Sequence, residues 1–484
     1  MVLQIAITTH HEHSSPTVSF PNLLLEWDRH PGNARNWSTF RKVYTIAIVS
    51  VIGFVSTIAT SMYSPGHQDV AREFGVSETM AMLPLSFYAL GLAFGPMLGS
   101  PMSETFGRKI VYLSTIPAFA MFILGSGLSK SIASLCVCRF FAGFFAAPGV
   151  SIATATIADT VAPDGRGVPL AIYFTMPFVG SLLGPVIGGL VSEWKGWRWT
   201  QWTTLFFAAT AFPLLGFVHE SYRGVLLQRI AKREGIGSSE HSKKLSNSLR
   251  AFFTKTVSRP VHMLFTEPIV GFVCLYCSFQ FALLYTFIVG MPYVFSHTYG
   301  FSAMQQSLSF LGLTIGAILA GITLVIMDYY VYQSIHRRFR VATPNGFFPP
   351  EHRLYPAMLG SCLLPIGLFF FAWTARSDVT WVVSLLAQCV TMLGSILAYV
   401  SVNMYMLDTY GPLYGASAAG ASSLARYVLT ACFPLFTLHM YKSLGTNWTA
   451  SLLGFCTLAM APIPLVFWKW GARLRARSCY EMEL

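Results

Sequence analysis

Long apolar runs separated by short polar segments are the dominant pattern along this chain. A helix of about 20 apolar residues is long enough to cross the hydrocarbon core of a bilayer. The pattern therefore predicts twelve transmembrane helices in two sets of six. The first set covers residues 42–63, 79–99, 110–128, 131–157, 168–191 and 199–218, and the second covers 267–296, 302–327, 355–374, 379–406, 412–440 and 449–469.

The polar stretches between and around these runs divide the chain into five parts. We expect an N-terminal tail at 1–41, a six-helix half at 42–218, a central loop at 219–265, a second six-helix half at 266–470 and a C-terminal tail at 471–484. Of the 484 residues, 54% are hydrophobic and only 11% are charged, whereas soluble domains carry about 25% charged residues. The predicted fold class is an all-α polytopic membrane protein.

The basic residues predict how the chain is oriented in the membrane. The net charge is +12, from 32 Lys and Arg against 20 Asp and Glu. With the N-terminus inside, 24 of the 32 basic residues fall in inside segments, six in outside loops and two within helices. Cytoplasmic loops of membrane proteins are enriched in Lys and Arg. Both termini are therefore expected in the cytoplasm, and the basic balance needs no nucleic-acid partner.

Several other classes of protein are excluded by the residues that they would need. Eight of the nine cysteines lie in apolar runs, which is typical of small buried hydrophobes rather than of a disulfide framework. Cys274-x-x-Cys277 has no second pair, so we expect neither a metal nor a cofactor. Lys130-Ser131 follows a serine instead of the glycine of a phosphate-binding loop. Because no helix pairs a histidine with a carboxylate, the chain is not expected to be an enzyme.

Glycines four residues apart recur in two of the predicted helices. The fifth helix contains Gly180, Gly184, Pro185, Gly188 and Gly189, and the second reads Gly91-Leu-Ala-Phe-Gly95-Pro96-Met-Leu-Gly99. Such glycines share one side of a helix and let another helix approach closely. Each row lies in the middle helix of a three-helix group, which predicts inverted repeats nested in the half. We expect helices 2, 5, 8 and 11 to pack along the interface between the halves.

The loop after the second helix gathers opposite charges. It reads Ser103-Glu104-Thr-Phe-Gly107-Arg108-Lys109. A carboxylate at a helix end, a turn glycine and two cations predict a charge cluster that holds neighbouring helix ends together. A simple anchor at the cytoplasmic surface would need the cations alone.

These features together resemble the major facilitator superfamily. The resemblance rests on the twelve helices, this loop, the segment Arg139-Phe-Phe-Ala-Gly143 and the Gly-Pro-Gly stretch of the fifth helix, which is similar to the superfamily's antiporter signature. Further segments are similar to fungal twelve-span drug–proton antiporters of the polyamine and multidrug exporter type. They are Asn36-Trp-Ser38, Ala158-Asp159…Arg166-Gly167, Arg259-Pro260, Pro350-Glu351-x-Arg353 and Ser417-Ala418…Arg426.

The resemblance implies a function as well as a fold. It implies a monomeric secondary active transporter in the plasma membrane that exports a drug-like, polyamine or secondary-metabolite molecule in exchange for protons, by alternating access. Uptake by a proton symporter or facilitator of the same fold is the alternative, against which the antiporter signature argues. A membrane sensor that does not transport is an alternative of another class.

Two arginines inside helices are candidates for coupling or gating, because ionisable groups in hydrocarbon are functional by default. The resemblance implies a role in proton transfer or coupling for Arg139, and Arg426 is a similar candidate. The alternative for each arginine is that it hydrogen-bonds backbone carbonyls and holds the bundle together. Arginine does not release a proton, and none of the 20 carboxylates lies in mid-helix. Asp159 is therefore the first proton-site candidate, unless it only pairs with Arg166. Glu104 and Arg108 are further gating candidates.

Polar residues in mid-helix are candidates for a substrate cavity. Gln280, Tyr285 and Gln388 fall near the centres of their helices, where hydrogen bonding between helices is the alternative. Asn447-Trp-Thr449 matches the acceptor pattern for N-glycosylation in a predicted outside loop.

Overall fold

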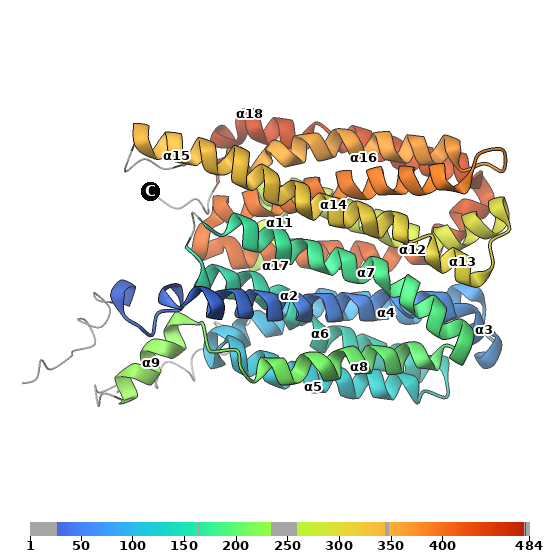
Figure 1. Cartoon of the computed structure of the whole chain (residues 1–484), viewed down its shortest axis with the longest axis horizontal. Coiled ribbons are helices and arrows are strands. Elements are labelled where there is room, and N and C mark those ends of the chain that lie inside the picture. Colours follow the sequence, from blue (N-terminus) through green and yellow to red (C-terminus); the bar gives the residue numbers. More distant parts are fainter. Residues whose placement is uncertain (1–26, 163–164, 234–258, 344–347, 479, 481–484) are drawn as a thin grey trace, which may run out of the picture.

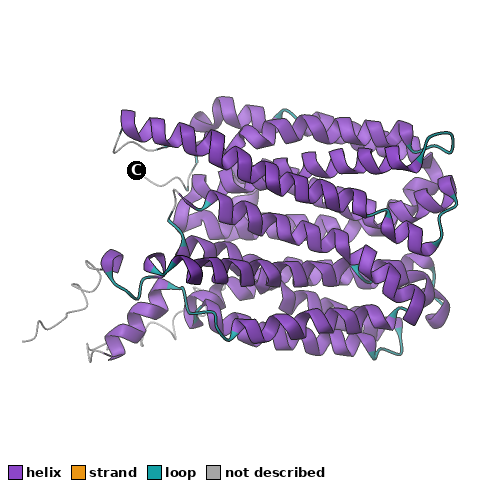
Figure 2. Cartoon of the chain, viewed as in Figure 1, coloured by secondary structure: helices purple, strands orange, loops and turns teal. Residues whose placement is uncertain are grey.

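The computed structural model describes residues 27–162, 165–233, 259–343, 348–478 and 480. Every regular element in these ranges is helical (Figure 2). The long helices run side by side along one axis, with α5 (Arg108–Gly127) and α8 (Arg198–Leu215) at one side of the bundle and α16 (Tyr355–Thr374) at the other (Figure 1). Residues 1–26 of the expected N-terminal tail, residues 479 and 481–484 of the expected C-terminal tail and most of the expected central loop lie outside the described residues.

The N-terminal half consists of α5, α8 and four further long helices. The short elements η1, η2, η3 and α3 precede or join them, and α9 follows α8. Their bounds are η1 Trp27–Arg29, η2 Ala34–Asn36, α2 Thr39–Ser61, η3 Ser64–Gly66, α3 His67–Phe74, α4 Glu78–Phe106, α6 Ile132–Thr160, α7 Gly167–Lys195 and α9 Arg223–Arg233.

The C-terminal half contains one very long helix, α17, which two glycines interrupt. Gly411 and Gly445 have positive φ angles of 55° and 75°, so α17 consists of three successive helical segments. The bounds in this half are α11 Arg259–Thr266, α12 Pro268–Tyr299, α13 Ala303–Leu308, α14 Leu311–Met327, η6 Asp328–Tyr332, α15 Gln333–Ala342, η7 Pro350–Leu354, α17 Trp381–Met460 and α18 Ile463–Arg475.

Ten helices of the described chain are long and apolar enough to cross a membrane. One of them, Ser417–Arg475, has 59 residues, which corresponds to about 90 Å of helix against about 30 Å of hydrocarbon. It turns at Gly445 and therefore crosses twice in our interpretation. The less apolar α8 packs beside α5, and counting it gives the twelve crossings that the hydrophobic pattern predicts.

The two ends of the bundle carry different elements. The helices α9 and α15 lie at one end, where the described chain also begins, and α3 and α13 lie at the other (Figure 1). We call these the tail end and the loop end. Several helices extend past the predicted apolar runs at the tail end; α4, predicted to end at residue 99, continues to Phe106. A helix keeps its backbone hydrogen bonds beyond the hydrocarbon, so hydrophobicity alone does not mark its end.

The glycine rows pack inside each half. A Cβ atom on Gly180 would lie 2.7 Å from the carbonyl oxygen of Phe54 in α2, and one on Gly188 would overlap the carbonyl of Met62 just after α2. Gly91 and Gly95 of α4 approach the backbone of α6 in the same way. Pro185 is buried in α7 beside this contact.

The expected packing of helices 2, 5, 8 and 11 along the interface between the halves is confirmed, because α4 contacts α17 and α7 contacts α14 there. The glycine rows on these helices mostly face partners inside their own half. Helix 2 pairs with helix 4, and helix 5 pairs with helix 1. If helices 1–3 and helices 4–6 are repeats of each other, helix 2 corresponds to helix 5 and helix 4 to helix 1, so the two pairs are equivalent. In the second half, Gly312 and Gly316 of α14 approach Leu385 and Cys389 of α17, so helix 8 pairs with helix 10. Backbone contact makes each half rigid, whereas Gly189 faces the other half at Ser307.

Candidate functional site

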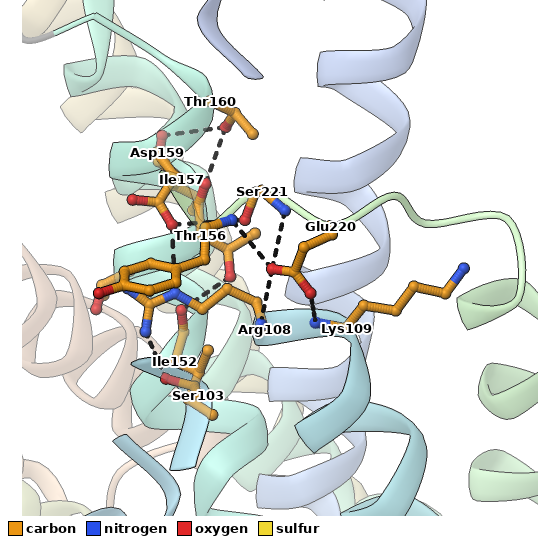
Figure 3. Close-up of polar contacts among 12 residues, drawn as sticks. Ser103, Arg108, Lys109, Ile152, Thr156, Ile157, Asp159, Thr160, Glu220 and Ser221 are labelled. Carbon is orange, nitrogen blue, oxygen red and sulfur yellow. Dashed lines mark hydrogen bonds and ion pairs between the residues drawn. The ribbon is translucent and has the colours of Figure 1, made fainter. Parts of the chain in front are cut away.

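A carboxylate from the end of the first half closes the loop after α4. Gly107 has a φ of 101°, and a Cβ there would lie 2.6 Å from the Glu220 carboxyl carbon. Glu220 accepts hydrogen bonds from the backbone N–H groups of Arg108 at 2.8 Å and Lys109 at 3.1 Å, which are the first residues of α5 (Figure 3). A negative charge at a helix N-terminus is stabilised by the helix dipole. The glycine is required because it lets the carboxylate reach this position.

Arg108 links this carboxylate to Asp159 at the end of α6. Its Nε donates to Asp159 at 3.2 Å, and a terminal nitrogen donates to Ser103 (Figure 3). Ser221 Oγ lies 3.5 Å from the same Asp159 oxygen. The expected charge cluster therefore exists, but the alternative pairing of Asp159 with Arg166 is wrong, since Arg108 is the nearer cation.

Glu104 is not the carboxylate of this cluster. It is exposed on the last turn of α4, and among the described residues it forms no ion pair within 4 Å. Proximity in sequence suggested Glu104, whereas the fold brings Glu220 from 112 residues away. Tyr222 completes the group, with Arg108 5.0 Å above its ring; burial raises the pKa of the Tyr222 phenol, so the ring stays neutral.

The second half repeats the arrangement with different side chains. Arg353 of η7 donates to Asp408, near the end of the first segment of α17, at 3.0 Å, and to Asp328 of η6 at 2.8 Å. The ring of Tyr332 lies 3.6 Å from the guanidinium. Arg353 and Asp328 are nearly fully buried. Each half therefore holds an arginine from the loop after its second helix against an aspartate at the end of its fourth.

The second cluster also contacts the first half. A Cβ atom on Gly167, the first residue of α7, would overlap Asp328 Oδ1 and lie 2.7 Å from an Arg353 nitrogen. The positive end of the α7 dipole thus faces a buried carboxylate of the other half. At the loop end, Lys442 of α17 pairs with Glu78 of α4 at 3.3 Å. The halves touch at both ends.

Arg139 is fully buried and holds the end of α2. Its terminal nitrogens donate to the carbonyl oxygens of Ala59 at 2.8 Å and Thr60 at 3.0 Å. The rings of Tyr63 and Tyr88 lie 5.4 and 4.6 Å from the guanidinium. Carbonyls at a helix end lack intrahelical donors, so these contacts match the bundle-locking alternative for this arginine.

Arg426 of α17 is bound differently, by aromatic rings. Its guanidinium lies 4.7 Å from the ring centre of Phe281 and 4.5 Å from that of Tyr427. It donates to the hydroxyls of Tyr399 and, at 3.3 Å, of Ser423. Both arginines contact aromatic rings, but Arg139 donates to backbone carbonyls and Arg426 to side-chain hydroxyls.

The three polar cavity candidates are all buried, and they lie in different surroundings. Gln388 of α17 donates to the Met291 sulfur of α12, which joins helices of the same half. Gln280 of α12 accepts a long hydrogen bond of 3.5 Å from Ser395. Tyr285 of α12 approaches Thr60 and Ser181 of the first half. Of the three, Tyr285 is the one near the interface between halves.

A small pocket lies between the halves at the tail end. Its cavity volume is about 30 Å³, room for one or two water molecules. The lining includes Gly167, Ala171, Arg353, Ser401 and Met404. It extends from the second ion cluster toward the centre of the bundle.

The remaining sequence candidates concern modification and metals. Asn447 lies half-buried in the first turn after Gly445, and the Thr449 hydroxyl is buried and donates to the carbonyl of Met440 at 3.1 Å. The described residues contain no group of three or more His, Cys, Asp or Glu side chains that could hold a metal ion.

Comparison with known proteins decides the family. Residues 49–434 match the description of the Major Facilitator Superfamily. The chain belongs to this superfamily. It is 33% identical to "Polyamine transporter 4" of Saccharomyces cerevisiae, over 98% of the chain and 77% of that protein. It is also 33% identical to "Probable drug/proton antiporter YHK8" of the same yeast, over 93% of the chain and 88% of that protein.

A solved structure agrees on the fold. The proton:xylose symporter XylE, bound to 6-bromo-6-deoxy-D-glucose, aligns with a TM-score of 0.65 over 90% of this chain and 96% of that one, at 17% identity. At this identity the likeness concerns the fold of the superfamily alone. The resemblance expected from the sequence motifs is confirmed by the family match and by the fungal relatives.

Proposed function

We propose that this superfamily member is a monomeric exporter in the plasma membrane that moves a small organic molecule out of the cytoplasm in exchange for protons. The tail end faces the cytoplasm in this proposal, as the excess of Lys and Arg in its segments supports. The antiporter-like stretch Gly180–Gly189 and the similarity to the yeast probable drug/proton antiporter support exchange rather than uptake.

One observation carries the mechanism: the halves touch through different chemistry at their two ends. At the tail end, buried Asp328 and Arg353 meet the start of α7, and at the loop end Lys442 meets Glu78 in a more exposed pair. Alternating access requires one set of contacts to break while the other holds. The backbone contacts of the glycine rows keep each half rigid during that motion.

Protons act on the tail-end carboxylates in this proposal. Asp159 pairs with Arg108 and Asp408 pairs with Arg353, and each pair lies inside one half. Opening of the tail end admits water to these pairs within their rigid halves, and a proton on the carboxylate then removes its attraction to the arginine. The protonation of these clusters therefore differs between the two conformations, so the proton gradient biases the conformational cycle.

The test is accumulation in a host that lacks its own exporters. Cells with and without this chain are loaded with spermidine, an azole or a fungal aromatic metabolite, with and without a protonophore. Lower accumulation that the protonophore abolishes supports proton-driven export. Higher accumulation would instead identify uptake by symport. Unchanged accumulation of every compound, with the protein present in the membrane, would remove the proposal in favour of a sensor that does not transport.

A further inference from the structure

The centre of the bundle between the halves is an aromatic cluster with a cation in it. Phe178 comes from α7 of the first half, and Phe281, Tyr399 and Tyr427 come from α12 and α17 of the second. The Phe178 ring lies 4.8 Å from that of Phe281 and 5.0 Å from that of Tyr399. Arg426 lies against three of these rings. The cluster is therefore completed by both halves.

Arg426 carries a buried charge without a counter-charge. The side chain is 5% exposed, and no carboxylate of the described residues lies within 4 Å of it. In the sequence, all 20 carboxylates lie outside the middle of the predicted helices. A buried charge is costly unless it is paired. Ring faces and two hydroxyls offset only part of that cost, because a cation over an aromatic ring gains less than an ion pair.

Unpaired polar atoms accompany this charge. The Nε of Arg426 is buried and has no hydrogen-bond partner. Ser181 Oγ, three residues after Phe178, is also buried without a hydrogen-bond partner. Buried polar groups in native proteins are almost always hydrogen-bonded. The Nε of Arg139 is also buried without a partner, but its terminal nitrogens donate to two backbone carbonyls, whereas those of Arg426 donate to hydroxyls only.

We infer that the substrate supplies the missing counter-charge: it is an organic anion with an aromatic body and a carboxylate-like acidic group. The acidic group pairs with the Arg426 guanidinium, and the aromatic part stacks among Phe178, Phe281 and Tyr427. Polyamines are disfavoured, since a polycation at this centre meets a fixed positive charge and no carboxylate. This inference rests on the proposed export function and narrows its substrate class.

Charge movement agrees with this assignment. An anion that leaves the cell while a proton moves inward carries charge in the same electrical sense as the proton. A membrane potential that is negative inside therefore assists both movements. The charge of Arg353 at the tail-end pocket is already balanced by Asp328 and Asp408, so Arg426 is the cation near the centre that such an anion would meet.

The test compares three probes of matched shape on the purified full chain. They are 1-naphthylacetate, its neutral amide and 1-naphthylethylamine, with spermidine as a fourth probe. Affinity is measured by quenching of tryptophan fluorescence or by calorimetry. A charge-assisted hydrogen bond to Arg426 predicts that the carboxylate binds at least about tenfold tighter than the amide. The amine and spermidine should bind more weakly still.

Variants separate the charge from the packing. Arg426→Gln should abolish the preference for the carboxylate, and Arg426→Lys should keep part of it. Arg376→Gln is the matched control: it removes one positive charge from an exposed loop-end site and should leave the order of affinities unchanged. If the amine or spermidine binds as tightly as the carboxylate, or if Arg426→Gln keeps the preference, the inference is wrong.

Flux measurements keep this result distinct from the proposed function. Reconstituted vesicles are given a pH gradient and loaded with each probe. Binding in the predicted order without proton-driven flux would leave the inference standing and overturn the export proposal. Proton-driven flux of spermidine in preference to naphthylacetate would support the export proposal and overturn the inference of an anionic substrate.

Discussion

A single methyl group at Gly167 should open the tail end of the bundle. Gly167 is the first residue of α7 and has an ordinary helical φ, so alanine there strains no backbone. The helix itself gains up to about 1 kcal/mol from the change. The added Cβ, however, would lie 2.6 Å from the carboxyl carbon of Asp328 and 2.7 Å from an Arg353 nitrogen. Any loss of tail-end closure in Gly167→Ala is therefore assigned to the contact between the halves.

The size of the effect follows from what must move. Ordinary contacts of a Cβ lie at about 3.5–4.0 Å, so the Asp328 carboxylate has to retreat by about 1 Å. That movement breaks its 2.8 Å hydrogen bond to Arg353. A hydrogen bond between charged groups contributes about 1.5–3 kcal/mol, which corresponds to a shift of about 10- to 150-fold in the population that is open at the tail end.

Native cysteines report this opening. Cys277 of α12 is fully buried near the centre, and Cys136 of α6 is buried toward the loop end. Alkylation by a small maleimide, followed by peptide mass spectrometry, should be at least about tenfold faster at Cys277 in Gly167→Ala, with Cys136 unchanged.

Gly165→Ala provides the control, because its Cβ would meet only Val161 at 3.6 Å. Equal Cys277 labelling in Gly167→Ala and the parent chain would refute the idea that this contact keeps the tail end closed.

Three further substitutions test other parts of the account. Asp159→Asn should reduce uphill efflux by about tenfold or more while substrate exchange without a gradient continues, as followed in reconstituted vesicles; undiminished uphill efflux would exclude Asp159 from coupling. Gly184→Ala should lower stability by about 1–3 kcal/mol through overpacking against α2, measured by thermal unfolding, whereas Gly420→Ala, with only ordinary contacts, should not. Glu220→Gln should lower the melting temperature by a few degrees, since it removes the negative charge from the start of α5; an unchanged melting temperature would mean that the charge contributes nothing there.

The helices could be predicted from the sequence because hydrophobic length alone determines whether a segment spans a bilayer. The glycine rows could also be recognised, but their partners could not. A row on one helix face shows that a backbone approaches it, and the sequence does not say which backbone. In the fold, Gly180 and Gly188 pack against α2 and the residue that follows it, rather than against the other half.

The sequence could predict that a charge cluster forms after the second helix, but it could not predict all of the residues that make up the cluster. Arg108 with a nearby carboxylate was expected, whereas Glu220 was missed because it lies 112 residues away. One signal could have found it: Gly107 and two basic residues begin a helix whose first N–H groups need an acceptor. Asp328, Arg353 and Asp408 of the second half gave no comparable signal, since no glycine turn marks their loop.

The two membrane arginines show a different limit. Both interrupt apolar runs, so hydropathy marks them equally. Their roles are separated by what surrounds them: carbonyls at the end of a helix for Arg139, and rings from both halves near Arg426. These surroundings come from residues distant in sequence, and only the assembled bundle brings them together.

Proton-driven export is tested most directly by the direction of proton movement during transport. Purified protein is reconstituted into vesicles with a pH-sensitive dye inside, and the compound with the largest accumulation difference in cells is added to the side of the tail end. Antiport predicts that a downhill gradient of this compound drives protons in the opposite direction, and that Asp159→Asn weakens the dye signal. Proton movement in the same direction as the compound, or compound flux without any proton movement, would contradict the account.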